Sequence, residues 1–160
     1  MSETSAEPTP EIKSMQLVEQ PTAVMRETVP MNALPEFFGR AFGAVMAAVQ
    51  NQGVQVAGPP FGLYRGTPTD VVDVEAGFPV SAPIHGADGV VPSALPEGQA
   101  LEVLHTGPYD TLAQTYADIQ ARMKDLGLVP ADMMWEYYLS DPAAEPDPAT
   151  WRTLVVWPVA

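Results

Sequence analysis

The stretch Met133-Met134-Trp135-Glu136-Tyr137-Tyr138-Leu139 does most to decide the fold of this chain. Its apolar and aromatic residues are typical of a strand, and alternate residues of a strand point to opposite faces of a sheet. Glu136 therefore shares its face with Met134 and Tyr138, whereas the opposite face carries only aromatic and aliphatic side chains. Because both faces are bulky and apolar apart from the glutamate, we expect a strand that is buried on both sides and holds a carboxylate inside the protein.

This strand belongs to a β-α-β-β unit in the second half of the chain. Residues 101–105 predict its first strand, and residues 151–159 predict its last. Between residue 105 and Met133, apolar side chains recur at the spacing of one helix face, namely at Leu112, Tyr116, Ile119, Met123 and Leu126. Gly127 is predicted to end this helix, since glycine accepts the left-handed conformation that often follows a helix.

The first half of the chain has the same order of elements. A strand begins at Met15, is interrupted at Pro21 and resumes over residues 23–27, so that Pro21 indicates an edge position or a bulge. The helix that follows begins at Leu34 and ends at Gly53, with an apolar face predicted at Leu34, Phe38, Phe42, Val45 and Val49. Residues 60–65 and 71–80 then predict two strands.

Two local matches indicate that one half duplicates the other. Phe61-Gly62-Leu63-Tyr64 corresponds to Trp135-Glu136-Tyr137-Tyr138, and Phe78-Pro79-Val80 corresponds to Trp157-Pro158-Val159. Each unit needs a neighbour against which to bury its apolar face. The sequence therefore predicts an α+β fold of tandem pseudo-symmetric βαββ repeats, with an antiparallel sheet, two helices and a cleft at the seam.

The expected domain covers residues 14–160, with repeats at about 14–80 and 99–160. Residues 1–13 are polar and contain proline, so we expect a disordered tail. Residues 81–98 are rich in proline and glycine and are interpreted as the linker between the repeats.

Composition narrows the range of functions. The net charge of −13 disfavours direct nucleic-acid binding and suits a cationic ligand or a basic protein partner, although it also serves solubility. The chain contains no cysteine, and its start lacks the features of a signal peptide. The absence of cysteine leaves the compartment open, with the cytoplasm as the simplest expected location, and no apolar run is long enough to span a membrane. His85 and His105 stand far apart without carboxylates at ligand spacing, so we expect no metal and no cofactor.

The chain resembles the GyrI-like small-molecule-binding domain family, also known as the effector-binding domain of bacterial transcription activators. The resemblance rests on the Gly107-Pro108-Tyr109 turn, the helix ending at Gly127, the segment from Trp135 to Pro142 and the closing Trp157-Pro158-Val159. It implies a domain that binds apolar, often cationic, organic molecules, with a pocket glutamate at the position of Glu136. It also implies a stand-alone member, because no DNA-binding segment is recognisable ahead of the domain.

The candidate ligand-binding residues are Glu136, Tyr138, Tyr64, Trp151 and Tyr109. Tyr138 shares the face of Glu136, Tyr64 is its counterpart in the first repeat, and aromatic rings suit a pocket for organic cations. Trp151 begins the strand expected beside Glu136, and Tyr109 opens the second helix. Two alternatives stay open: Glu136 pairs with a lysine or arginine or faces water, and each aromatic ring serves only core packing.

Three functions follow as hypotheses. The first is drug sensing or sequestration, in which hydrophobic organic cations bind around Glu136. The second is hydrolysis of electrophilic cyclopropane-type natural products, with Glu136 as general base and a nearby tyrosine as acid. The third is a protein-interaction module of the gyrase-inhibitor type, which the resemblance also implies and which does not need Glu136.

Overall fold

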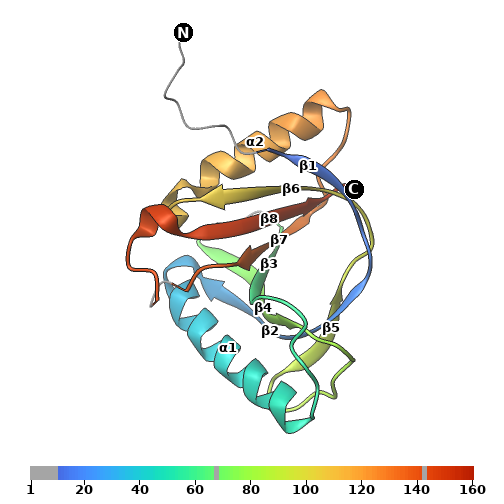
Figure 1. Cartoon of the computed structure of the whole chain (residues 1–160), viewed down its shortest axis with the longest axis vertical. Helices are drawn as coiled ribbons and strands as arrows, with labels where there is room; N and C mark the ends of the chain where they lie inside the picture. Colours follow the sequence, from blue (N-terminus) through green and yellow to red (C-terminus); the bar gives the residue numbers. More distant parts are fainter. Residues whose placement is uncertain (1–10, 67–68, 142–143) are drawn as a thin grey trace.

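The computed structural model describes residues 11–66, 69–141 and 144–160. These residues form one eight-stranded antiparallel sheet in the order β1-β6-β8-β7-β3-β4-β2-β5, together with two α-helices (Figure 1). The helices are α1 (Leu34–Asn51) and α2 (Leu112–Asp125). The strands are β1 (Lys13–Leu17), β2 (Gln20–Pro30), β3 (Phe61–Arg65), β4 (Val71–Pro79), β5 (Val91–Leu95), β6 (Gly98–Thr106), β7 (Met133–Tyr138) and β8 (Arg152–Pro158).

The two repeats have the same strand order, which confirms the pseudo-symmetric βαββ fold. The first repeat, β2-α1-β3-β4, contributes β3-β4-β2 to the sheet, and the second, β6-α2-β7-β8, contributes β7-β8-β6. The repeats join where β3 pairs with β7, and in that register Gly62 lies opposite Glu136. Because these two residues are also equivalent in the repeats, the pseudo-twofold axis passes between them.

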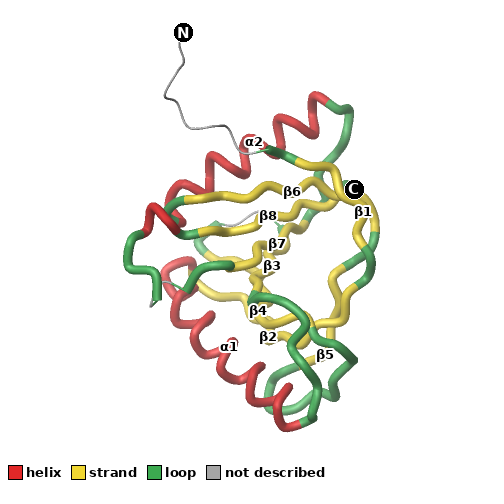
Figure 2. Tube along the Cα trace, viewed as in Figure 1, coloured by secondary structure: helices red, strands yellow, loops and turns green. Residues whose placement is uncertain are grey.

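The sheet is curled into a half-barrel. Only Val18 and Glu19 separate β1 from β2, and only Pro96 and Glu97 separate β5 from β6. Five strands nevertheless lie between the two members of each pair in the sheet order. Links this short span only about 10 Å, so the two ends of the sheet must approach each other (Figure 2). Leu17 of β1 and Leu95 of β5 accordingly pack in one hydrophobic cluster inside the curl.

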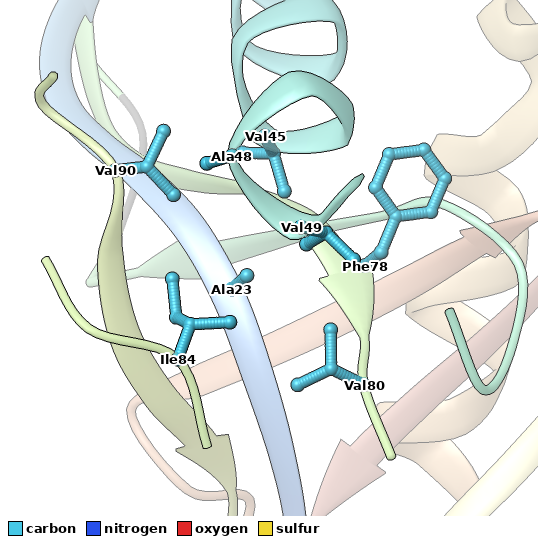
Figure 3. Close-up of a cluster of buried hydrophobic side chains, with 8 residues drawn as sticks. All are labelled: Ala23, Val45, Ala48, Val49, Phe78, Val80, Ile84 and Val90. Carbon is cyan, nitrogen blue, oxygen red and sulfur yellow. The ribbon is translucent and has the colours of Figure 1, made fainter. Parts of the chain in front are cut away.

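Both helices cover the outer face of the curled sheet. α1 packs on β4 and β2, and α2 packs on β6 (Figure 1). Figure 3 shows one of the resulting clusters, in which Val45, Ala48 and Val49 of α1 meet Phe78 of β4 and Ala23 of β2. The inner face holds a separate core around Trp135 and Phe61.

The segment between the repeats is more than a linker. Residues 81–98 include β5, which pairs with β2, and this strand was not predicted. Ile84, Val90 and Leu95 of the same segment are buried in the hydrophobic core. The proline and glycine content suggested a loop, but spaced apolar residues are enough to anchor such a segment against a sheet.

The predicted apolar stripe of α1 proved to be only part of its apolar surface. The side chains buried against the sheet are Phe37, Ala41, Val45, Ala48 and Val49. Phe38 and Phe42 are half-buried instead, because they lie on the flank of the helix that borders a cavity. In α2 the predicted stripe holds at Leu112, Ile119 and Met123, whereas Leu126 lies past the helix end and is exposed.

The expected disordered tail lies mostly outside the described residues. Of its last residues, Lys13 already pairs with Glu102 in the β1–β6 ladder, and Ile12 packs against the cluster under α2. The predicted interruption falls at Val18 and Glu19, between β1 and β2, and not at Pro21, which lies inside β2 and pairs with Ala94 of β5. Within the described part of the chain, neither helix has the length and apolarity needed to cross a membrane.

Candidate functional site

A cavity of about 1270 Å³ lies at the seam between the repeats. Its lining residues come from both helices and from β3 and β7, where the two repeats join. The central lining side chains are Phe38, Tyr64, Tyr109, Tyr116, Glu136 and Tyr138. The cleft predicted at the seam is therefore present.

The two repeats contribute equivalent positions of different chemistry. Phe38 and Tyr116 are each the fifth residue of their helix, and Met31 and Tyr109 each begin the 3₁₀ turn before it. The first repeat places a ring without a hydroxyl and a thioether where the second places two phenols. Gly62 likewise stands where the second repeat has Glu136. Apart from Tyr64 of β3, the cavity consequently has an apolar side formed by the first repeat and a polar side formed by the second.

Glu136 is the buried acid of the polar side. Its side chain belongs to β7, and the residue is only 2% exposed. The Tyr116 hydroxyl donates a hydrogen bond to Oε2, and the Tyr138 hydroxyl donates to Oε1 at 3.0 Å. The Tyr64 and Tyr138 hydroxyl oxygens are 3.0 Å apart. Since Tyr138 gives its proton to the carboxylate, Tyr64 must donate to Tyr138.

These phenols stabilise the charge on a carboxylate that burial disfavours. Burial raises the pKa of Glu136, while the hydrogen bonds from Tyr116 and Tyr138 partly offset that rise. The pKa values of Tyr64, Tyr116 and Tyr138 are also raised, chiefly by burial and further by the nearby Glu136. All three phenols therefore stay protonated and remain donors at neutral pH.

The described residues that line the cavity include no lysine, arginine or histidine. The ion pairs found in the described part of the chain join Arg26 to Asp73, Arg40 to Glu27 and Arg65 to Glu75, so none of them involves Glu136. Asp132 and Asp141 add further acidic side chains at the rim. The cavity is thus negatively charged. Among the described residues Glu136 has no salt-bridge partner, and its side chain is not exposed to water.

Tyr109 and Trp151 have different places at the site. Tyr109 lines the cavity mouth, with its ring 6.1 Å from that of Tyr138 and 4.9 Å from that of Trp151. Trp151 itself is outside the lining and donates from Nε1 to the Glu145 carbonyl at 2.6 Å. The structure therefore brings Glu136, Tyr138, Tyr64 and Tyr109 together and leaves Trp151 behind Tyr109 as its support.

Sequence reasoning missed two residues of the site, Tyr116 and Phe38, because both were assigned to a core-facing stripe. The signal for Tyr116 was its hydroxyl, since a buried phenol needs a hydrogen-bond partner.

His105 proves to be a buried structural residue: Nδ1 lies 2.8 Å from the Thr115 hydroxyl and Nε2 lies 2.9 Å from that of Thr111. No group of three or more metal-ligating side chains occurs among the residues that the structure describes.

A concave site with aromatic walls and a few convergent polar groups is typical of a protein that binds organic small molecules. The chain belongs to the GyrI-like small-molecule-binding domain family, whose family model matches residues 8–160. A search of curated proteins found no match.

Solved structures share this fold. The C-terminal domain of EcmrR is 21% identical with a TM-score of 0.82, and the match covers 94% of this chain and 98% of that domain. A hydrolase from Listeria innocua is 14% identical with a TM-score of 0.63, over 96% of this chain and 94% of the other. SAV2435, solved bound to tetraphenylphosphonium, is 10% identical with a TM-score of 0.64, over 94% of both chains. At these identities the likeness is one of fold.

Proposed function

We propose that this protein binds a hydrophobic organic cation, with the positive charge beside Glu136 and the apolar body against α1. The observation that carries this proposal is a buried carboxylate in a large cavity whose described lining residues include no basic side chain. An isolated buried charge is costly, and a cationic ligand offsets that cost.

The hydrogen-bond directions favour a cation over an anion. The protons of Tyr116, Tyr138 and Tyr64 are all used in the chain that ends at Glu136. The phenols therefore offer a ligand only oxygen lone pairs and ring faces, both of which attract positive charge. An anion would meet negative charge and no free donor from these three side chains.

The apolar side of the cavity suits the body of such a ligand. Phe38 and Phe42 stack at 5.6 Å between ring centroids, and Val72 and Met31 extend this surface. The complex of SAV2435 with tetraphenylphosphonium, a cation with four phenyl groups, supports the same ligand class on the same fold.

The test is Glu136→Gln, titrated with tetraphenylphosphonium and with neutral triphenylphosphine oxide. Affinity for the cation should fall by about 1.5–3 kcal/mol, the range for hydrogen bonds that involve charged groups. Binding of the neutral compound should change much less, since the amide keeps the size and polarity of the side chain. Equal losses for both compounds, or a marked loss of stability, would contradict the role of Glu136.

A second candidate is hydrolysis of an electrophilic small molecule. The favouring observation is the direct hydrogen bond from Tyr116 to Glu136, which places an acid and a base side by side in the cavity. The binding protein and the hydrolase can be distinguished by incubating the protein with a cyclopropane-bearing electrophile and measuring formation of the water adduct by mass spectrometry. Turnover that disappears in both Glu136→Gln and Tyr116→Phe would favour the enzyme, and binding without product would favour the sensor.

A further inference from the structure

Gly62 lies opposite Glu136 in the β3–β7 ladder, and the space that its side chain would occupy is already filled. A Cβ atom at Gly62 would stand 2.9 Å from the Tyr138 hydroxyl oxygen. It would also stand 3.0 Å from Cε1 and from Cζ of Phe38. Two cavity residues from different repeats thus meet directly above this glycine.

The Tyr138 hydroxyl depends on that space for its hydrogen bonds. From its position over Gly62 it reaches Oε1 of Glu136 at 3.0 Å and the Tyr64 hydroxyl at 3.0 Å. The Phe38 ring meets the Tyr138 ring edge-on, with centroids 5.7 Å apart, and stacks on Phe42 behind it. A side chain at position 62 would therefore compete with the hydroxyl that holds the buried acid.

We propose that Gly62 is a positioning residue for the polar side of the cavity: its missing side chain lets Tyr138 hold Glu136 and so sets the affinity for cations. The ligand part of this inference rests on the proposed function. The positioning part concerns the empty protein and can be measured without a ligand.

The structure indicates how Gly62→Ala acts. Gly62 does not have the positive φ that disfavours alanine, so the backbone accepts the substitution. The added methyl group must then displace its neighbours, and the phenol tip moves more readily than the paired strand. Tyr138 should lose its hydrogen bond to Glu136, which would keep only the bond from Tyr116.

The first measurement is a titration of wild type and Gly62→Ala with tetraphenylphosphonium. We expect binding to weaken about tenfold, as for the loss of one hydrogen bond to a charged group. The affinity for neutral triphenylphosphine oxide should change by at most about twofold, because a neutral ligand depends much less than a cation on the charge of Glu136. Gly43→Ala is the matched control, since a Cβ there meets nothing within 4 Å, and it should leave both affinities unchanged. Unchanged affinity for the cation in folded Gly62→Ala would overturn the proposal.

A double-mutant cycle identifies the neighbour through which Gly62 acts. Tyr138→Phe removes the hydroxyl that the methyl group would displace, so adding Gly62→Ala to it should change cation affinity by less than about twofold, the non-additive result expected of coupled residues. A tenfold loss in both backgrounds would show that the methyl group acts on Phe38 or simply fills the cavity. If Gly62→Ala alone does not fold, Tyr138→Phe should restore folding, and failure of both variants contradicts the proposal.

The titration of Glu136 separates this inference from the proposed function. The Tyr138 hydrogen bond lowers the pKa of Glu136, so Gly62→Ala should raise that pKa in the empty protein. Carbon-13 NMR of labelled glutamate measures this directly. If wild type does not bind tetraphenylphosphonium, the proposed function fails while the NMR shift still tests Gly62. An unmoved titration in a folded variant would refute the positioning role.

Discussion

Among single residues, Glu136 and Tyr116 show what sequence reasoning reaches and what it does not. Glu136 was identifiable because a carboxylate within an apolar strand requires an explanation. Tyr116 was visible only as one member of a helix stripe, since its partner lies 20 residues away on another element. The contact depends on how α2 crosses the sheet, which a stripe of apolar residues does not specify.

The raised pKa of Glu136 predicts how stability depends on pH. A carboxyl whose pKa is higher in the folded than in the unfolded protein stabilises the fold below the unfolded value, and this contribution is lost as pH rises through the folded value. Glu136→Gln should therefore match wild type near pH 4. At pH 7 it should be more stable than wild type, because the neutral amide does not carry the cost of a buried charge. Melting curves of both proteins across this pH range provide the measurement. A stability difference that does not grow with pH would show that ionised Glu136 does not destabilise the folded protein.

At the scale of elements, α1 has two apolar flanks with different roles. One flank, with Phe37, Ala41 and Val45, is buried on the sheet, and the other presents Phe38 and Phe42 to the cavity. Helical periodicity predicted the length of the helix well, because both flanks contribute to it. It could not divide core from cavity, since apolar side chains serve both.

The outer face of α1 offers a stabilising substitution. Gly43 is exposed within the helix, and a Cβ there meets no atom within 4 Å. Gly43→Ala should raise the free energy of unfolding by about 0.5–1 kcal/mol, because glycine loses more backbone entropy than alanine in a helix. Urea unfolding at constant m-value measures the gain. A loss of stability would mean that this turn of α1 is not a regular, solvent-facing helix.

At the scale of the whole molecule, β1 closes one side of the half-barrel. It pairs with β6, and the link of Val18 and Glu19 carries the chain directly to β2 near the opposite end of the sheet order. The strand therefore connects two regions that the order of the sheet sets far apart. Its contribution to stability should exceed that of an ordinary edge strand of five residues.

Two truncations test this contribution. Removing residues 1–10 should leave the melting midpoint unchanged, because that segment is polar and has no apolar periodicity. Removing residues 1–17 should cost about 2–3 kcal/mol, or roughly 5–10 °C, since the β1–β6 ladder and the packing of Leu17 are lost. Calorimetry of the two truncated proteins gives the comparison. Similar midpoints would show that β1 contributes little to closing the half-barrel.

The sequence by itself determined the repeat, the two helices and the identity of the central acid. These features depend on local periodicity and on pairs of matching segments, both of which can be read along the chain. Only the tertiary structure decided that residues 81–98 supply β5, that Tyr116 and Tyr138 hold Glu136, and that Trp151 stands behind Tyr109. The physical reason is that these outcomes depend on the curl of the sheet and on the angle at which each helix crosses it, and packing between distant segments sets both.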